Sequence, residues 1–541
     1  MATLFFGDNL NILRESIKDE SVDLIYLDPP FNSKRDYNLL FKSPAGQASD
    51  AQIMAFEDTW HWTEQTALEF HQLLHQPNTD VAEFMQAIRS FLGENDMMAY
   101  LSCMAIRLLE LHRVLKPTGS LYLHCDPTAS HYLKIVLDAV FSPENYRNEI
   151  TWLRSKNPKG SQYQAKRFSP DTDIILFYAK SSKADLNYRQ IKIPLTDEEL
   201  KIKYDRVDEK GQYTDGPILR SPTMGDRPNL VYEYMNYTPG SHGWRVTREK
   251  LIEIDQRGNL GWSTSGKPFR KLRPEEDTGK PIGNCWIDIS PINPQAFERL
   301  GFPTQKPLAL LERIIQASSR EGDVVLDPFC GCGTAVHAAQ KLHRDWIGID
   351  ITNLAISTIE KRLKDAFPGI AFDVQGTPKD LASAQDLAKR NKYQFQWWAC
   401  ALVNAQPFQG KKKGADTGID GLIFFQDEAN AFKKIIVSVK GGDHVGVSMV
   451  RELDSVVNRE HAALGLLVTL TPPTQAMRTE ANAAGFYHAP HHGDFPKIQI
   501  LTVEGLLNGS EFAHYPDLAR GGLTFRKAAP EPPVQEQAQL L

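Results

Sequence analysis

The stretch that decides the fold is Val324-Val-Leu-Asp-Pro-Phe-Cys-Gly-Cys-Gly-Thr334. Its apolar start predicts a buried strand, and its glycines predict a tight loop before a helix that begins at Thr334. Glycine lets the backbone approach a nucleotide closely, and the first turn of a helix offers free N–H groups. The next predicted strand ends at Asp350, whose carboxylate suits the two hydroxyls of a ribose. The segment therefore predicts a nucleotide-type cofactor site, with a tight turn that binds nothing as the alternative.

Strands and helices alternate on both sides of this loop. We expect strands at residues 2–6, 22–27, 121–124, 324–326 and 346–349, and helices beginning at Asp8 and at residues 97–115, 132–141, 308–319, 334–342 and 354–363. Such alternation is typical of a parallel sheet with helices on both faces.

A second motif, Asp28-Pro29-Pro30-Phe31, follows one of the predicted strands. The two prolines fix the backbone and lack N–H donors, so the peptide carbonyls there stay free to accept hydrogen bonds. A carboxylate and a carbonyl together can hold both N–H bonds of an aromatic amino group and stabilise the positive charge that builds on its nitrogen. The ring of a flipped-out base can stack on Phe31. Taken alone, the motif is also compatible with a simple turn.

The order of these two motifs resembles that of the amino-DNA methyltransferases with the permuted, beta-type arrangement. In that family the Asp-Pro-Pro-aromatic motif comes first and the cofactor loop comes last. Gly7-Asp8-Asn9 and Thr304-Gln305-Lys306-Pro307 also resemble family segments, so the resemblance covers roughly residues 3 to 365. It implies a Rossmann-like, circularly permuted methyltransferase sheet that uses S-adenosylmethionine. The expected parts are a catalytic half at 1–180 and a cofactor-binding half at 295–375.

The resemblance also assigns the site residues. The catalytic set is Asp28, Pro29, Pro30 and Phe31. The cofactor-binding set is Asp8 near the adenine, Lys306 near the methionine part, and Asp327, Pro328, Phe329, Gly331, Gly333, Thr334 and Asp350 around the glycine loop.

The expected reaction is methylation of N6 of a flipped-out adenine in double-stranded DNA. Asp28, where the cytosine enzymes carry Ser, favours adenine, and an N4-cytosine methyltransferase remains the alternative. Phe31 stands where tyrosine is commoner in the family, which keeps the stacking face and removes a hydroxyl.

Residues 181–294 interrupt the α/β pattern with a polar, turn-rich and aromatic stretch. The family places its target-recognition region there, so we expect a small separate fold that reads bases. The candidate side chains are Lys156, Lys159, Arg220, Arg227 and Arg245, because long cationic side chains can reach base edges in the major groove.

A further α/β unit is expected at 391–507, after a polar linker at about 375–390. Two predicted antiparallel strands carry Asp420 and Lys440, and they resemble the Mrr-like branch of the restriction-endonuclease fold. In that branch acidic residues bind Mg²⁺ and a lysine orients the attacking water.

Two substitutions weaken this nuclease-like site. Gln396 stands where Glu is usual, and Ser438 stands where Glu or Gln is usual. No firm metal site is therefore expected, and Mg²⁺ is needed only if the domain is an active nuclease. Two hypotheses stay open: an inactive nuclease fold that binds DNA, and a fused restriction–modification enzyme that cleaves it. Residues 525–541, rich in Pro, Glu and Gln, are expected to be disordered.

The composition sets the frame for these expectations. The 541 residues are 41% hydrophobic and 24% charged, which is typical of several globular domains. The six cysteines are scattered and there is no long apolar run, so a cytoplasmic, reduced protein is expected. The net charge of −6 excludes a uniformly basic DNA-binding surface but not a local basic cleft. A homodimer and a separate restriction subunit remain open.

Overall fold

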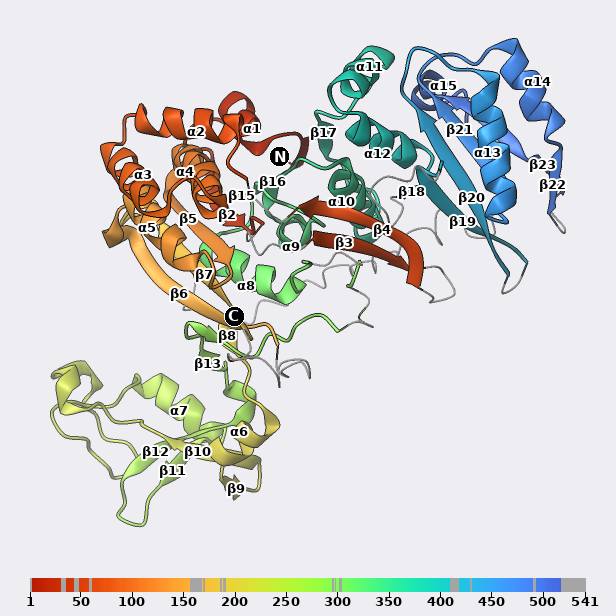
Figure 1. The fold of residues 1–541 in the computed structure, drawn as a ribbon. Coiled ribbons are helices and arrows are strands. Elements are labelled where there is room, and N and C mark those ends of the chain that lie inside the picture. Colours follow the sequence, from red (N-terminus) through yellow and green to blue (C-terminus); the bar gives the residue numbers. More distant parts are fainter. Residues whose placement is uncertain are drawn as a thin grey trace. The chain divides into compact units, whose positions relative to one another are not determined.

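The computed structural model describes residues 2–30, 36–42, 48–57, 61–155, 168, 171–184, 187, 191–293, 296, 298–300, 304–408, 418–428, 431–489 and 493–516. The chain divides into two compact units (Figure 1). Unit 1 combines Met1–Asn187 with Asn284–Leu541, and unit 2 is Tyr188–Gly283. Unit 2 falls within the insert expected at 181–294, and the expected disordered tail at 525–541 lies outside the described residues.

The centre of unit 1 is a nine-stranded sheet in the order β14-β6-β7-β5-β2-β15-β16-β1-β17. The strands are β14 (Cys285–Trp286), β6 (Tyr146–Leu153), β7 (Thr172–Ala179), β5 (Leu115–Cys125), β2 (Val22–Leu27), β15 (Val324–Asp327), β16 (Asp345–Asp350), β1 (Ala2–Phe6) and β17 (Asp373–Gln375).

Most of this sheet is parallel, as the alternation predicts, but β7 is not. It pairs antiparallel with both β5 and β6, whereas every other neighbouring pair is parallel. No helix intervenes between β6 and β7 in the described residues, and a parallel pair needs a long crossover, usually a helix. The predicted parallel sheet is therefore confirmed except at β7.

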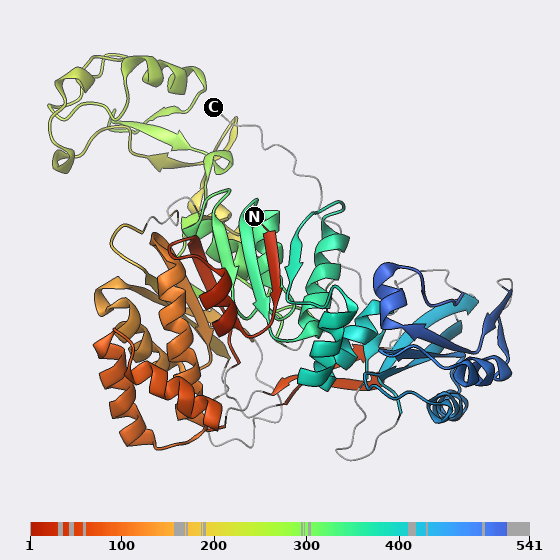
Figure 2. The ribbon, with the colours of Figure 1, turned by 90° about the horizontal axis from the view of Figure 1, so that it is seen from above.

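Helices lie on both sides of the sheet (Figure 2). They are α1 (Asn9–Ser16), α2 (Glu64–Leu74), α3 (Thr79–Leu92), α4 (Asp96–Val114), α5 (Ser130–Phe141), α8 (Leu308–Ser318), α9 (Thr334–Lys341) and α10 (Asn353–Ala366). The expected helices are all present, with ends close to the predicted ones. An antiparallel hairpin of β3 (Asp36–Lys42) and β4 (Ala48–Glu57) was not predicted.

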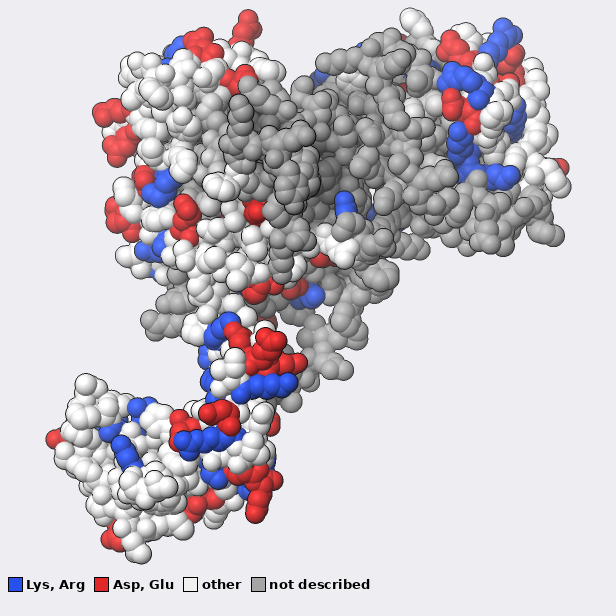
Figure 3. Space-filling model, turned by 60° about the horizontal axis from the view of Figure 1, so that its bottom comes forward, with Lys and Arg blue, Asp and Glu red and all other residues white. Residues whose placement is uncertain are grey.

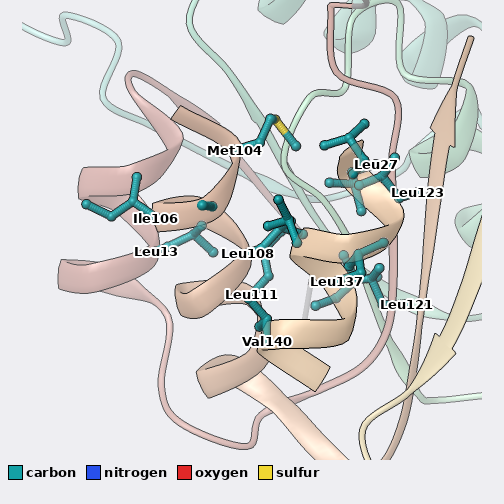
Figure 4. Close-up of a cluster of buried hydrophobic side chains, with 14 of the residues drawn as sticks. Leu13, Leu27, Met104, Ile106, Leu108, Leu111, Leu121, Leu123, Leu137 and Val140 are labelled. Carbon is teal, nitrogen blue, oxygen red and sulfur yellow. The ribbon is translucent and has the colours of Figure 1, made fainter. Parts of the chain in front are cut away.

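A cluster of buried apolar side chains joins these helices to the sheet (Figure 4). Leu13 of α1 and Leu108 and Leu111 of α4 pack with Leu27 of β2 and Leu121 of β5, and none of the five is exposed. Burying one such side chain stabilises the fold by about 1.5–3 kcal/mol. The cluster therefore holds the end of β2 firmly, at the point where the second motif begins.

Unit 2 has its own small sheet and core. The strand order is β11-β12-β10-β9, with β11 (Leu260–Trp262), β12 (Pro268–Leu272), β10 (Gly211–Gly216) and β9 (Arg206–Asp208). The helix α7 (Arg248–Gln256) covers a core built around the fully buried Trp244. The short α6 (Asp197–Lys203) and the pair β8 (Lys192–Ile193) and β13 (Lys280–Pro281) complete the unit.

The C-terminal part of unit 1 contains a five-stranded sheet in the order β18-β19-β20-β21-β24. Its elements are β18 (Gln406–Pro407), β19 (Gly421–Glu428), β20 (Ala431–Lys440), β21 (Leu464–Thr469), β24 (Ile498–Thr502), α12 (Lys392–Leu402), α13 (Val447–Arg459), α14 (Gln475–Ala483) and α15 (Val503–Asn508), with a hairpin of β22 (Phe486–Ala489) and β23 (Gly493–Pro496). The expected antiparallel pair is confirmed as β19 and β20, with Lys440 at the end of β20 and Asp420 immediately before β19.

The prediction of a polar linker at about 375–390 was wrong, because most of this segment forms the helix α11 (Leu381–Arg390). Asp380 caps the helix in a reciprocal pair of hydrogen bonds with Ser383. Ala384 and Leu387 are buried on one face of α11. Their spacing of three residues is helical, but the polar composition of the segment hid it. Among the described residues, no helix combines enough length and apolar character to cross a membrane.

Candidate active site

One pocket of unit 1 gathers segments that lie far apart in the sequence. It opens at the carboxyl ends of the neighbouring strands β2, β15 and β16, the usual place for a ligand in an open α/β sheet. Its walls include Asp8, Tyr26, Asp28, Pro29, Pro30, Arg107, Lys306, Asp327, Pro328, Phe329, Gly331, Thr334 and Asp350. Gly333 does not line the pocket, and Phe31 lies outside the described residues.

The glycine loop needs glycine for two physical reasons. Gly331 and Gly333 have φ values of 51° and 74°, in the left-handed region that other residues rarely adopt. A Cβ on Gly333 would also lie only 2.7 Å from Cγ1 of Ile359 in α10. The loop thus turns sharply enough for α9 to begin at Thr334, with its first N–H groups beside the pocket.

Asp350 ties this loop to β16. Its Oδ2 accepts from the backbone N–H of Gly331 at 2.9 Å, and its Oδ1 accepts from the N–H and the hydroxyl of Thr352, both at 2.8 Å. Burial raises the pKa of Asp350 above its ordinary value. The side chain expected to bind a ribose is therefore already fixed in position by the protein.

Asp327 is the most strongly perturbed carboxyl group of the pocket. Its Oδ1 accepts from the N–H of Phe329 at 3.0 Å. Burial, reinforced by the negative charges of Asp28 and Asp350, raises the pKa of Asp327 to about 8. Below about pH 8 the Asp327 carboxyl group therefore keeps its proton beside Asp28 and Asp350, and a bound cation would favour its ionised form.

Asp28 has one occupied and one open carboxylate oxygen. The ammonium group of Lys306 lies 2.5 Å from Oδ2. Oδ1 is buried and has no hydrogen-bond partner among the described residues. A buried acceptor without a donor costs about 1–3 kcal/mol, so its presence points to a ligand that supplies a donor. Lys306, expected to contact the cofactor, lines the pocket and also pairs with Asp28.

A buried polar chain lies behind Asp28, and the sequence analysis missed it. The hydroxyl of Tyr26 lies 3.0 Å from Nδ1 of His124, and Nε2 of His124 lies 3.1 Å from Oδ2 of Asp173. Nε of Arg154 lies 3.2 Å from the other oxygen of Asp173. These groups join β2, β5 and β7, so they fix the strand that carries Asp28. His124 and Asp173 gave no signal in the sequence, because each stands in an ordinary apolar strand.

A second missed residue is Arg107, which is buried in α4. Its Nη2 donates to Asp8 at 3.0 Å and its Nε donates to Asn9 at 2.6 Å. Asn9 in turn donates to the carbonyl of Pro328 at 2.8 Å, and Glu69 lies 3.6 Å from Nη1 of Arg107. Arg107 therefore connects the start of α1 to the glycine loop. An arginine within a run of apolar helix residues was the available signal.

The candidate base-reading residues are only partly described. Lys156 and Lys159 lie outside the described residues. Arg220 donates to the carbonyl of Met224, and Nε of Arg245 donates to the carbonyl of Leu219 at 3.0 Å. The Arg227 side chain is exposed.

The nuclease-like site of the C-terminal part is occupied by protein groups. The Gln396 amide donates to Oδ1 of Asp420, and the N–H of Val439 donates to Oδ2 at 2.6 Å. Ser438 is buried, and Lys440 lies at the end of β20. No group of three or more His, Cys, Asp or Glu side chains is arranged for a metal ion within the described part of the chain.

Comparison with known proteins identifies the family of the chain. The family model described as DNA methylase, which covers the N6 and N4 enzymes, matches residues 22–361. The chain belongs to this DNA methylase family. Residues 398–508 match a second model, the NACHT-associated inactive Restriction Endonuclease 1.

Two curated relatives are a type II methyltransferase and a subunit of a type III restriction–modification enzyme. The type II methyltransferase M.EcaI of Enterobacter cloacae is 34% identical over 264 residues, which are 49% of this chain and 57% of the relative. The Mod subunit of the type III enzyme StyLTI of Salmonella typhimurium is 26% identical over 357 residues, 63% of this chain and 50% of the subunit. The chain thus spans about half the length of these relatives.

Solved methyltransferase structures are also similar to the chain. A putative DNA modification methylase from Thermus thermophilus, complexed with S-adenosyl-L-methionine, has a TM-score of 0.34 at 16% identity, covering 70% of this chain and 100% of that one. The PvuII DNA methyltransferase, which is cytosine-N4-specific, has a TM-score of 0.34 at 13% identity, covering 69% and 89%.

Proposed function

We propose that the chain transfers a methyl group from S-adenosylmethionine to N6 of an adenine flipped out of double-stranded DNA. One observation carries the proposal: Oδ1 of Asp28 is buried without a partner among the described residues, in the pocket that also holds the glycine loop. The amino group of a flipped-out base would supply the hydrogen-bond donor that Oδ1 of Asp28 lacks among the described residues. The order of the two motifs along the chain supports the permuted, beta-type arrangement.

The residues of the pocket fit S-adenosylmethionine. Asp350 is held where it can accept from ribose hydroxyls, and Asp8 lies at the pocket wall. The first turn of α9 offers N–H groups, and the carboxyl groups of Asp28 and Asp327 suit a positively charged sulfonium. When bound, this cofactor supplies the activated methyl group. Gly331 and Gly333 shape the loop around it.

The protein's own groups prepare the amino nitrogen of the base. Oδ1 of Asp28 accepts one N–H bond, and a carbonyl oxygen of the Asp28–Pro30 segment accepts the other. Together they turn the nitrogen lone pair toward the methyl donor and stabilise the charge that develops on the nitrogen. Lys306 keeps the Asp28 carboxylate in place through Oδ2, and the chain from Tyr26 to Asp173 keeps β2 in place.

The base assignment rests on Asp28, and N4 of cytosine is the alternative. The purified protein is incubated with labelled S-adenosylmethionine and unmethylated genomic DNA, and the nucleosides are identified by mass spectrometry. We expect N6-methyladenine from the wild type, and its loss in Asp28→Ala with cofactor binding retained. The exposed Asp80→Ala serves as the matched control and keeps full activity. N4-methylcytosine would replace the adenine assignment, and full activity of Asp28→Ala would remove Asp28 from the mechanism.

We further propose that the protein is the modification partner of a restriction–modification system and that its C-terminal part does not cleave DNA. The occupied carboxylate of Asp420 supports the second point, because the Gln396 amide and the Val439 N–H take up oxygens that a nuclease offers to Mg²⁺. Supercoiled plasmid with Mg²⁺ is expected to stay uncut. Nicking that needs Mg²⁺ and disappears in Lys440→Ala would overturn the proposal.

A further inference from the structure

A chain of three buried polar side chains ends at the pocket of unit 1. The hydroxyl of Tyr26, which lines the pocket, lies 3.0 Å from Nδ1 of His124, and Nε2 of His124 lies 3.1 Å from Oδ2 of Asp173. Charged side chains on the face shown in Figure 3 are solvated by water, whereas His124 is fully buried and Asp173 is 3% exposed. Apolar side chains of similar size would be less costly to bury, and buried ionisable groups beside a pocket are often functional.

Tyr26 lies where the two motifs of the pocket meet. Tyr26 and Asp28 are two residues apart at the end of β2, so their side chains lie on the same face of the sheet. On the neighbouring strand β15, Leu326 pairs with Ile25, which places Asp327, at the start of the glycine loop, beside Tyr26. Burial and the negative charge of Asp28 raise the pKa of Tyr26 well above its ordinary value. The hydroxyl therefore keeps its proton and lies beside both the catalytic segment and the cofactor loop.

Asp173 fixes the direction of the hydrogen bonds along the chain. Burial alone would raise the pKa of Asp173, but the hydrogen bond from His124 and nearby positive charges lower it, so the carboxylate is ionised. An ionised carboxylate only accepts, so Nε2 of His124 carries a proton and donates to it. In the neutral imidazole Nδ1 is then an acceptor, and the Tyr26 hydroxyl donates to it. With its proton turned toward His124, the Tyr26 oxygen keeps its lone pairs for the pocket.

We propose that Tyr26 is a further catalytic residue, whose oxygen presents a lone pair to the sulfonium charge, and that His124 and Asp173 are positioning residues that orient it. This inference deepens the proposed function, because it takes the bound cation to be that of S-adenosylmethionine. An acceptor that is fixed beforehand stabilises positive charge without having to reorient during the reaction. Tyr26 forms and breaks no covalent bond and keeps its proton. A hydroxyl with its proton turned into the pocket would instead oppose the charge.

Asp173→Asn reverses the chain without shortening any side chain. Nε of Arg154 lies 3.2 Å from Oδ1 of residue 173 and can only donate, so it selects the carbonyl oxygen of the amide for that position. The amide NH2 then donates to Nε2 of His124, so the ring proton moves to Nδ1 and donates to the Tyr26 oxygen. The hydroxyl proton of Tyr26 is thereby turned toward the pocket. Tyr26→Phe removes the oxygen, so Asp173→Asn has no hydroxyl to reverse in that background.

The test compares the affinities for S-adenosylmethionine and for S-adenosylhomocysteine, whose sulfur is uncharged, by calorimetry without DNA. Tyr26→Phe is expected to lower the ratio of the two affinities about three- to tenfold, the range for one modest polar interaction. Asp173→Asn should lower the ratio further, and the double variant should equal Tyr26→Phe.

Tyr122→Phe is the matched control and should keep the wild-type ratio. Tyr122 pairs in register with Tyr26 on β5 and is equally buried, but its hydroxyl lies 2.6 Å from Oγ of Ser318 and it does not line the pocket. Removing this hydroxyl therefore takes one buried hydrogen bond from the same face of the sheet and leaves the pocket intact.

Melting temperatures and single-turnover methyl transfer to DNA are measured on the same proteins. A purely structural role would lower the melting temperature of Asp173→Asn and leave the affinity ratio unchanged in both single variants, which would overturn the inference. An equal effect of Asp173→Asn with and without the Tyr26 hydroxyl would also overturn it. If Asp173→Asn does not fold, the ratio in Tyr26→Phe decides alone.

The two readouts separate this inference from the proposed function. Affinity ratios that change as expected, in a wild type that transfers no methyl group to DNA, would leave the role of Tyr26 standing and refute the proposed function. Methyl transfer by the wild type with an unchanged ratio in Tyr26→Phe would do the reverse. A wild type that binds neither compound would refute both.

Discussion

Replacing Asp327 by asparagine should make the protein without cofactor more stable, and increasingly so as the pH rises. Burial raises the pKa of this carboxyl group to about 8 from an ordinary value near 3.8. Between these two values the folded state holds a proton on Asp327 that the unfolded chain releases. Stability therefore falls as the pH rises through this window, by about 1.4 kcal/mol per pH unit. Asparagine carries no charge, and its carbonyl can still accept from the N–H of Phe329.

Between pH 5 and pH 8 the advantage of Asp327→Asn over wild type should grow by about 4 kcal/mol at most, because local relaxation reduces the full effect. Thermal or urea unfolding of both proteins without cofactor is followed across this range, with the exposed Asp80→Asn as control. Parallel pH curves for Asp327→Asn and wild type would refute the reasoning. The same variant is expected to bind S-adenosylmethionine more weakly above about pH 8, where the wild-type carboxyl group is ionised and asparagine cannot supply its negative charge.

Three further predictions concern the parts around the pocket and unit 2. In Gly333→Ala the alanine must adopt a positive φ, and its Cβ would lie 2.7 Å from Ile359. The variant should therefore lose about 1–3 kcal/mol of stability and bind the cofactor more weakly in equilibrium dialysis. Unchanged binding would contradict the role of the loop. Arg107→Met leaves Asp8 without its ion pair and should destabilise the fold by about 3–5 kcal/mol, with Arg107→Lys recovering part of the loss in a thermal scan; equal melting of Arg107→Met and wild type would show that the pair contributes nothing. Trp244→Ala empties the core of unit 2 at a cost of about 3–5 kcal/mol, so limited proteolysis should cut unit 2 first while cofactor binding persists; intact unit 2 would contradict this.

The sequence predicted the features whose signals are local. The alternation of apolar and polar residues placed β2 and β15, and the glycines and prolines marked the two loops that follow them. The resemblance to the methyltransferase family then assigned Asp28 to the catalytic motif and Asp327 to the cofactor loop, and both line one pocket of the structure.

The features that the sequence did not predict depend on distant partners. Lys306 binds Asp28 across 278 positions, and Arg107 binds Asp8 across 99, so neither pair has a spacing that a local pattern could reveal. The direction of β7 is likewise set by which strands it meets in the sheet, not by its own residues. In α11 the helical spacing was present, but the polar residues around it obscured it.

The position of β1 has a consequence for the protein as it is being made. β1 lies between β16 and β17, and about 340 residues separate Phe6 from Asp345. A ribosome adding about 5–20 residues per second needs roughly 20 seconds to a minute to cover that distance. Throughout this interval the apolar side chains of Leu4 and Phe5 have no partner strands to pack between. The glycine loop that completes the pocket around Asp28 has not yet been synthesised. These groups therefore stay without their partners for much of the synthesis, and the pocket is incomplete until Thr352, the last of its lining residues along the chain, has emerged.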